Sequence, residues 1–548
     1  MRHGIFALLL CAGAFVMNAQ AYKDGVDYYK IGQSENAKYL LDKNLDQTDT
    51  DKAIAYYYLG RIALDGKDAN AAKDYFNKGV ATNADQPLNY VGLGEIELKA
   101  GATKEAESQF KEALSKGKKD ATAAVEIARA YYRTDATKYA KQIEECLKKA
   151  TNMEKKVGSE GYNKNQTEIQ IFYGDRYVDQ NDPDKACECY DQIVTLFDET
   201  NPVAAVKYAE YFYKMNERMA IDKLQTVVDK NPNSAMAKRQ LADLYYKKQQ
   251  YTAAVKLYQD YIQDPNHLPN DEVRYAEILF QAKDYVDAVD QCSIYLKKDP
   301  KHLGVKRIRF YAQYKAGDWQ DAFKDGCVFF DEIETAPEKY NATDFTYMAE
   351  VLLNIDRKDD AIRCYRNIVN IAKNDEEKVD ALRKYSEGLN YVQKFKESAA
   401  ALEELVAIDS SNLNDIYTLS RRYYSAAQAD ETFKKEGCEK ALKYIDIAIE
   451  KAPSNIFLYK WKAKYYTLLD TKSDGGHALE AYKEYVKQLK ADEVDDSQQG
   501  NDFMEPYIYI ANYYLGKKNT AEAKSYFQAA LECDPSNDKL RQFISTLK

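Results

Sequence analysis

Histidine and cysteine are the residues with the most direct capacity for acid–base, redox or metal chemistry. The chain has only 4 His in 548 residues, and histidine is the usual proton carrier and metal ligand near neutral pH. His267 and His302 lie in equivalent loops of successive units of the repeat described below. Because no Cys, Asp or Glu at ligand spacing completes a metal site with them, we expect both to be solvent-exposed loop residues.

The cysteines form no recognisable redox or metal motif. Eight follow the N-terminal segment, and they are widely spread along the chain. Cys187 and Cys189 are two residues apart, and on a helix such residues point to nearly opposite sides. We expect free, buried thiols that pack as small apolar residues: Cys146, Cys187, Cys189, Cys292, Cys327, Cys364, Cys438 and Cys533.

Other catalytic and cofactor motifs are missing from the sequence. It has no G-x-x-x-x-G-K-[ST] phosphate loop and no H-E-x-x-H zinc motif. The stretch Asp42–Ala53 is rich in Asp and Asn, but it lacks the Gly and Glu that a Ca²⁺ loop places sixth and twelfth. We expect no catalytic residue, no metal site and no cofactor, so the chain is not predicted to be an enzyme.

Composition indicates a soluble, helical chain. It is 45% hydrophobic and 30% charged, with a mean hydropathy of −0.65, unlike a membrane or a disordered protein. Its 11 Pro and 23 Gly leave little room for the turns of an all-β fold. The net charge is −10 and the two signs are interspersed, which argues against nucleic acid or an anionic membrane surface as the partner.

The N-terminal segment Met1–Ala21 has the features of a secretory signal peptide. Arg2 is followed by an apolar run, Gly4–Met17, and then by Ala19-Gln20-Ala21. The apolar run is too short to cross about 30 Å of hydrocarbon. We expect cleavage before Tyr22 and export to a bacterial periplasm. The alternative is association with the outer membrane, although the Leu residues before Cys11 make a poor lipoprotein signal.

A regular repeat with a period of 34 runs along the chain. The small residues Gly60, Gly94 and Ala128 recur at this interval, and Ala72, Ala106 and Ala140 repeat it twelve positions later. Four positions further on comes an aromatic residue, as at Phe76 and Phe110. The same pattern returns at Gly174/Ala186/Tyr190, Ala242/Ala254/Tyr258, Ala349/Ala361/Tyr365 and Ala511/Ala523/Phe527.

This spacing predicts helical hairpins. Small residues let two antiparallel helices approach closely, and the large residue fills the gap to the next hairpin. Turn residues separate the two helices, as at Asp65–Asp68 and Ala100-Gly101. Proline follows the second helix, as in Asn231-Pro232 and Asp534-Pro535.

The pattern resembles the tetratricopeptide repeat (TPR) family, in its length of 34, small residues at repeat positions 8 and 20, aromatics at 11 and 24, and Pro at 32. The resemblance implies an all-α, right-handed superhelical TPR solenoid of about 13 hairpins. It is weaker where Phe310, Glu387 and Ser420 replace the small residue at position 8. A degenerate hairpin, Tyr22–Asp46, precedes the array and a helix, Asn537–Lys548, caps it. The repeats begin near residues 53, 87, 121, 167, 201, 235, 269, 303, 342, 380, 413, 456 and 504.

Breaks in the period suggest the domain organisation. Extra residues precede Thr167, lie around Pro337–Asn341 and Ala426–Gly437, and form the polar run Ala491–Asn501. We expect these to be loops, since a linear array tolerates insertions between its helices. The expected division is a signal peptide at 1–21, N-terminal TPR repeats at 22–154, a central array at 155–490, and a C-terminal repeat with its capping helix at 491–548.

The resemblance also implies a binding surface. In this family the first helix of each repeat lines a concave face, through repeat positions 2, 5, 9, 12 and 13. Tyrosine beside Arg or Lys suits a peptide, because the ring covers apolar side chains while the cation meets carboxylates. The residues expected on this face are Arg129, Tyr132, Arg133, Arg239, Asp243, Tyr246, Lys247, Arg307, Tyr311, Tyr314, Lys315, Arg421 and Tyr424.

These observations favour a non-catalytic scaffold or adaptor of the bacterial envelope, attached to an envelope complex and binding a peptide or partner protein in the concave groove. The alternative is a glycan-capturing, outer-membrane-associated TPR protein. Such proteins resemble lipoproteins with Trp-rich sugar platforms, whereas this chain has only Trp319 and Trp461, in positions not expected to form one platform. A hydrolase with an unrecognised site is a third, less favoured hypothesis.

Overall fold

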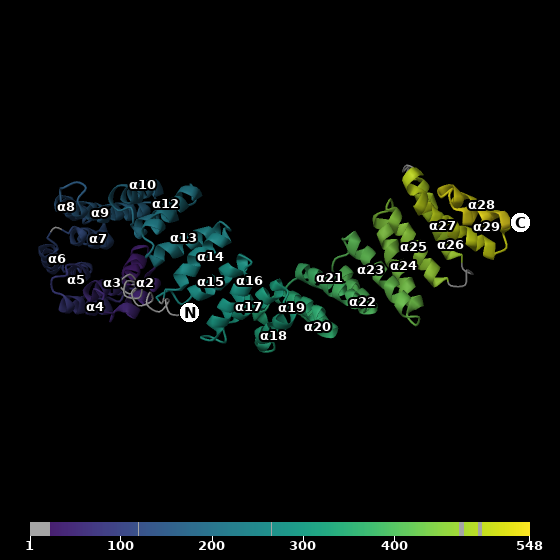
Figure 1. The fold of residues 1–548 in the computed structure, drawn as a ribbon, viewed down its shortest axis with the longest axis horizontal. Coiled ribbons are helices and arrows are strands. Elements are labelled where there is room, and N and C mark those ends of the chain that lie inside the picture. The colour runs from purple at the N-terminus through teal and green to yellow at the C-terminus, as the bar shows by residue number, and fades with distance from the viewer. Residues whose placement is uncertain (1–21, 119, 265, 471–475, 492–495, 548) are drawn as a thin grey trace, which may run out of the picture. The chain divides into compact units, whose positions relative to one another are not determined.

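The structure is a computed structural model that describes residues 22–118, 120–264, 266–470, 476–491 and 496–547. The predicted signal peptide, 1–21, lies outside the described residues. Within those ranges every regular element is a helix (Figure 1). The chain divides into two compact units, Met1–Arg309 and Phe310–Lys548, each treated separately below. The boundaries expected at 155 and 491 remain predictions.

The first compact unit contains a helical segment over 22–30 followed by helices that pair into hairpins. Their bounds are α2 Ser34–Asn44, α3 Lys52–Asp65, α4 Ala69–Thr82, α5 Leu88–Lys99, α6 Thr103–Gly117, α7 Thr122–Asp135, α8 Ala140–Asn152, α9 Glu160–Asp179, α10 Pro183–Gln192, η1 Ile193–Phe197, α11 Pro202–Phe212, α12 Glu217–Lys230, α13 Ala235–Lys247, α14 Tyr251–Ile262, α15 Asp271–Gln281 and α16 Tyr285–Leu296. Helix α17, Leu303–Ala316, contains the division between the two units.

The second compact unit continues the same arrangement. Its elements are α18 Trp319–Phe329, η2 Phe330–Glu332, η3 Pro337–Lys339, α19 Ala342–Asn354, α20 Lys358–Ile371, α21 Asp375–Tyr391, α22 Phe395–Ile408, α23 Leu413–Ala429, α24 Lys434–Lys451, α25 Ile456–Leu469, α26 His477–Ala491, α27 Asp496–Gly516, α28 Thr520–Cys533 and α29 Asp538–Thr546. In both units the second helix of a hairpin packs on the first helix of the next, as α4 does on α5 and α22 on α23. The fold is therefore the predicted all-α solenoid, and α29 packs on α28 at its end.

Most hairpins begin within a few residues of the predicted positions, with a few exceptions. The sequence predicts a loop over Lys155–Gln166, but α9 begins at Glu160 because the Ser159 side chain accepts a hydrogen bond from the Tyr162 backbone N–H and caps the helix. The insertion at Ala426–Gly437 is also not a long loop. It lengthens α23 and α24, which approach closely at Gly437, where a Cβ would lie 2.9 Å from that of Ala427.

The small-residue positions have the predicted role. A Cβ added to Gly60 would lie 2.4 Å from the Phe76 ring, and one added to Gly174 would lie 2.4 Å from Tyr190. Both rings are fully buried. The hairpin therefore closes only because the first helix has no side chain where the ring of the second helix lies.

Two repeats that depart from the pattern keep this packing by other means. Phe310 stands at the small position of its repeat, and the opposite helix compensates with Gly326. A Cβ added to Gly326 would lie 3.2 Å from the Phe310 ring. In the repeat predicted to start near 380, Glu387 is not at the close approach. Ser386 is, and it exchanges hydrogen bonds of 2.8 to 2.9 Å with Ser398. The register is thus one residue earlier than predicted.

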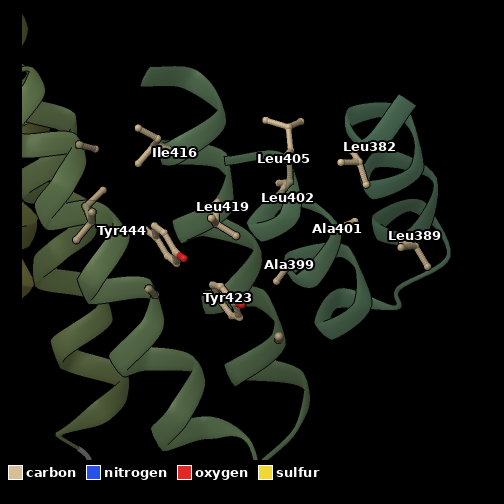
Figure 2. Close-up of a cluster of buried hydrophobic side chains, with 14 of the residues drawn as sticks. Leu382, Leu389, Ala399, Ala401, Leu402, Leu405, Ile416, Leu419, Tyr423 and Tyr444 are labelled. Atoms are coloured by element: carbon tan, nitrogen blue, oxygen red, sulfur yellow. The ribbon is translucent and has the colours of Figure 1, made fainter. Parts of the chain in front are cut away.

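Leucine, alanine and tyrosine side chains form the cores between hairpins. Figure 2 shows one such core in the second compact unit, where Leu402 and Leu405 of α22 lie between the helices α21 and α23. Tyr423 and Tyr444 stack at 6.1 Å between ring centroids, and both hydroxyls donate to Glu403. These two tyrosines thus contribute to packing, with their hydroxyls satisfied at the edge of the core.

Candidate functional site

The inner face of the first compact unit is formed by the first helices of successive hairpins. Helix α3 packs on α5, α5 on α7 and α7 on α9. This is the face on which the sequence predicts a peptide groove. Its occupant in the structure is a segment of the same chain, the helix over 22–30 with α2.

This N-terminal hairpin contacts first helices that are far apart in sequence. Tyr28, Ala37 and Leu40 share a buried cluster with residues of α11, α12 and α13, and Ile31 packs on a cluster formed by α9, α10 and α11. Tyr22 and Leu41 pack with residues of α3 and α4 (Figure 1). Tyr28 is 1% exposed. The hairpin over 22–44 is therefore a fixed part of the unit, held by side chains from helices as distant in sequence as α13.

Polar contacts hold the same hairpin in place. The Lys30 ammonium lies 3.0 Å from the Glu168 carboxylate of α9. The Tyr29 hydroxyl donates to Asp65 at 2.7 Å and accepts from the Arg61 guanidinium at 3.2 Å. Burial raises the pKa of Asp27 to about 7. A cavity of about 530 Å³ opens beside this helix, and its lining includes Lys30, Lys164 and Glu168.

A network of charges on this face uses two of the arginines predicted to bind a partner. Arg133 lies 2.9 Å from Glu95, which Arg61 also contacts at 2.7 Å. Burial alone would raise the pKa of Glu95, but Arg133 and Arg61 outweigh it and lower the pKa to about 2. Arg129 lies 2.7 Å from Asp175.

These predicted residues are therefore already paired within the array. Arg129 and Arg133 have exposed side-chain fractions of 16% and 26%, and their guanidinium groups already meet carboxylates. Tyr132 is half-buried against the edge of Phe172. All three lie on α7, the first helix of its hairpin. The sequence pattern does not predict that carboxylates of other helices already pair with the two arginines.

Farther along the same face, α13, α15 and the loop before α17 line an open polar groove. It encloses about 490 Å³ and is lined by Arg239, Gln240, Asp243, Lys247, Asn270, Asp271, Val273, Arg274, Glu277 and His302. Arg239, Asp243 and Lys247 are among the predicted residues. The pattern missed Gln240 and Arg274, although they too lie on the first helices of their hairpins.

Some polar side chains of this groove already have partners within the chain, and others do not. Arg239 binds Asp271 with two hydrogen bonds, of 2.7 and 3.1 Å. Arg274 stacks over the Tyr246 ring at 3.9 Å. In the described part of the chain, the buried Gln240 side-chain amide nitrogen has no hydrogen-bond partner, and the Lys247 side chain is exposed. An unpaired donor and an exposed cation thus lie beside an aromatic–guanidinium stack.

The remaining predicted residues lie on α17. Tyr314 stacks on Tyr347 of α19 at 4.1 Å between ring centroids, and the Lys315 ammonium lies 4.7 Å from the centre of the Tyr347 ring. The Tyr311 hydroxyl donates to Asp344 at 2.7 Å. Arg307 is half-buried on the part of α17 in the first compact unit. The sequence did not single out Tyr347, which joins the tyrosines of α17 into one aromatic cluster.

A second aromatic cluster lies on α23 and α25. The Arg421 guanidinium covers the Trp461 ring at 3.5 Å, and Tyr424 packs on the same ring at 5.9 Å. Trp319 packs on Tyr314 at 6.0 Å. Each tryptophan therefore contacts tyrosines of its own cluster.

The histidines are not the exposed loop residues that the sequence predicts. His267 is 16% exposed and its Nε2 lies 2.8 Å from Glu272, while its ring packs against Tyr261. His302 accepts a hydrogen bond of 3.1 Å from the Val305 backbone N–H, so it caps the start of α17. Among the described residues no group of three His, Cys, Asp or Glu side chains is placed to hold a metal ion.

The cysteines are free, but they are not all buried. Cys187, Cys189, Cys292 and Cys438 are buried, whereas Cys327 is exposed and Cys146, Cys364 and Cys533 are intermediate. Burial raises the pKa of the Cys187 and Cys189 thiols to about 11, which makes them poor nucleophiles at neutral pH. The prediction of buried thiols is therefore wrong for Cys327, whose side chain is exposed on α18.

Comparison with known proteins identifies the repeat directly in one segment. Residues 218–267 match the tetratricopeptide repeat family. The segment includes α13 and α14, the hairpin whose first helix carries Arg239 and Gln240. TPR proteins generally mediate protein–protein interactions, and the fold is typically a non-catalytic scaffold. No curated protein matches the chain, and no described helix has the length and apolarity needed to cross a bilayer.

Solved TPR structures resemble parts of the chain. The C-terminal part of a TPR protein from Cytophaga hutchinsonii is 20% identical, with a TM-score of 0.36, over 49% of this chain and 98% of its own. A TPR protein from Parabacteroides merdae is 10% identical, with a TM-score of 0.31, over 47% of this chain and 98% of its own.

Proposed function

We propose that this protein is a non-catalytic scaffold that binds a segment of a partner protein on the inner face of its TPR array, at the groove formed by α13, α15 and the loop before α17. One observation carries the proposal: the same inner face, from α9 as far as α13 itself, already binds the helix over 22–30 through apolar and ionic contacts. The face is thus suited to a protein ligand.

The groove offers what an extended peptide requires. The Gln240 side chain lines the groove, and its buried amide nitrogen has no partner in the described chain. A rotation of this side chain toward the groove would let it donate to a peptide carbonyl. Exposed Lys247 can meet a carboxylate of the partner, whereas Arg274 is already paired with Asp243 and Glu277. The half-buried Tyr246 ring supplies an apolar surface beside them.

We further propose that the chain is exported through residues 1–21 and acts as an adaptor of a bacterial envelope complex in the periplasm. The support is the sequence of that segment. Attachment to the outer membrane is the alternative location. The glycan-capturing alternative has less support, because Arg421 covers one face of the Trp461 ring, and open ring faces are what a sugar platform requires.

Site-specific photocrosslinking in native cells tests the proposed groove. A photoreactive residue at position 247 should capture a discrete protein, whereas one at Lys141, which is 86% exposed on α8, should not. Adding Gln240→Leu should reduce the yield at 247 severalfold without changing thermal stability. Equal capture at both positions, capture of glycan alone, or no effect of Gln240→Leu would contradict the proposal. Arg239 is unsuitable as a test, since its removal would leave buried Asp271 without its counter-charge.

A further inference from the structure

An apolar cleft lies on the outer side of the second compact unit, away from the first-helix face. It encloses about 530 Å³ between the second helices α18 and α20, with α19 beneath them. This volume lies within the range of roughly 300–1,000 Å³ found for ligand sites in proteins. Apolar side chains form most of its floor: Phe323, Phe330, Ile333, Phe345, Met348 and Leu352.

The chain departs from its regular period at this cleft. Helix α17 begins at Leu303, and α19 begins at Ala342, several positions later than one period would place it. The extra residues form the short helices η2 and η3, through which the chain passes after α18 ends at Phe329. The cleft therefore lies at this repeat junction, and it is larger than the comparable cleft of about 390 Å³ between α6 and α8.

The rim of the cleft carries an excess of positive charge. Arg357, Arg363 and Arg366 line it together with a single carboxylate, Asp360. Arg357 and Arg363 both form ion pairs with Asp360, so the two guanidinium groups share one carboxylate. Arg366 is exposed and has no ion-pair partner among the residues that the structure describes. The neighbouring Asp359 pairs with Lys394, at 2.6 Å.

From this arrangement we propose that the cleft is a docking site for an acidic amphipathic helix of a partner protein. Leucine-like side chains on one face of that helix fill the apolar floor, and carboxylates on its flank meet the three arginines. This follows the general helix-in-groove mode of recognition, in which apolar anchors recur at helical spacing. The site is independent of the inner-face groove.

The spacing of the arginines favours a peptide over a lipid carboxylate. Arg357 and Arg366 lie nine residues apart at the start and in the middle of α20, a rise of about 14 Å at 1.5 Å per residue. A fatty acid presents one carboxylate, which can meet only one end of this row. A partner helix with acidic residues on two or three successive turns presents carboxylates over the same length.

A pair of synthetic peptides tests the proposal with the full chain. The probe is a fluorescein-labelled helix of about 16 residues, long enough to form a helix in water, with Leu at helical spacing and Glu on its flanks. The control peptide has Lys in place of every Glu. Fluorescence anisotropy should show micromolar binding of the Glu peptide, weakened by salt, and at least tenfold weaker binding of the Lys peptide.

Matched variants assign the binding to the cleft. The double variant Arg363→Glu/Arg366→Glu should weaken binding of the Glu peptide about tenfold. The control Lys435→Glu/Lys539→Glu makes the same change in net charge at exposed residues outside the cleft and should bind as the wild type does. Circular dichroism should show that both variants are folded, as expected for exposed residues.

Cys327 provides an independent footprint, because it is exposed and lines the cleft. The Glu peptide should slow its alkylation by N-ethylmaleimide severalfold. Cys364 lines the same cleft, but burial raises the pKa of its thiol to about 12, so its own slow reaction should not obscure the measurement. Similar binding of both peptides, unchanged binding by the Arg363→Glu/Arg366→Glu variant, or unprotected Cys327 would overturn the proposal. So would binding of dodecanoate at the cleft without binding of the Glu peptide.

Discussion

Buried charges on the inner face of the first compact unit are set by partners that local sequence does not reveal. Glu95 is 1% exposed and lies between Arg61, also 1% exposed, and Arg133. The repeat pattern predicts that Arg129 and Arg133 lie on the inner face, and the structure places them there. The pattern cannot predict that both arginines are already ion-paired. Their carboxylate partners come from neighbouring first helices, whose relative rotation depends on packing.

Replacing Glu95 tests whether this network stabilises the unit. Glu95→Gln should lower the free energy of unfolding by about 3 kcal/mol, since it leaves buried cations without a counter-charge. Glu97→Gln is the matched control, as Glu97 is 30% exposed and pairs with Lys73 at 3.2 Å. An exposed pair of this kind contributes at most about 1 kcal/mol. Urea unfolding followed by far-UV circular dichroism measures both.

The pH dependence of stability provides a second test of the Glu95 network. The pKa of Glu95 is lowered to about 2 from an ordinary value near 4.3, so its stabilisation is complete above about pH 4.3 and is lost as the pH falls toward 2. Wild-type protein should therefore lose about 3 kcal/mol more than Glu95→Gln between pH 5 and pH 2. An equal loss in the two proteins would show that Glu95 is not held ionised by the arginines.

At the scale of the element, the close approach of paired helices decides which residues the repeat accepts. Phe76 lies between two glycines, because a Cβ on Gly60 would meet its ring at 2.4 Å and one on Gly92 would meet it at 2.5 Å. The ring therefore has no direction in which to move. This explains why the regular recurrence of small residues predicted the hairpins so well from sequence alone.

Gly60→Ala should destabilise the first compact unit by about 1–3 kcal/mol, the usual cost of overpacking a filled core. Gly161→Ala is the control. Its Cβ would meet nothing closer than the flexible Glu154 side chain at 3.6 Å, so the better helix propensity of Ala should make it neutral or stabilising by up to about 1 kcal/mol. Circular dichroism melts compare the two, and equal melting temperatures would contradict the packing argument.

In other hairpins, a residue on one helix compensates for an unexpected residue on its partner helix, and a pattern along a single helix does not predict this. Phe310 looks like a break in the pattern when its helix is considered alone. Gly326 on the opposite helix leaves the space that the Phe310 ring fills, so the packing is kept. Ser386 and Ser398 form an equivalent pair in which hydrogen bonds replace the contact of an aromatic ring. Both could be found in sequence by comparing the two helices of a hairpin together, whereas the lengthening of α23 and α24 depends on packing that the pattern does not encode.

At the scale of the whole molecule, the least predictable feature is the return of the N-terminal hairpin to helices α11, α12 and α13. The sequence predicts a degenerate first repeat over Tyr22–Asp46, and local periodicity would pair it only with α3. The structure also packs Leu40 in the cluster that contains Val206 and Leu241. Such contacts depend on how far each hairpin rotates relative to the last, and the small rotations add up over the array.

This long-range packing predicts that a change in α2 affects stability far along the chain. Leu40 is 3% exposed, so Leu40→Ala should cost about 2–5 kcal/mol and speed hydrogen exchange in α11, α12 and α13 as well as in α3. Both tryptophans, Trp319 and Trp461, lie in the second compact unit, so the tryptophan fluorescence transition should not shift. The control is Leu489→Ala in α26, where Leu489 is 5% exposed. It should shift the tryptophan fluorescence transition and leave hydrogen exchange in α11, α12 and α13 unchanged. If Leu40→Ala accelerated exchange only in α2 and α3, the hairpin would be a local cap and the inner face would be open to a partner along its whole length.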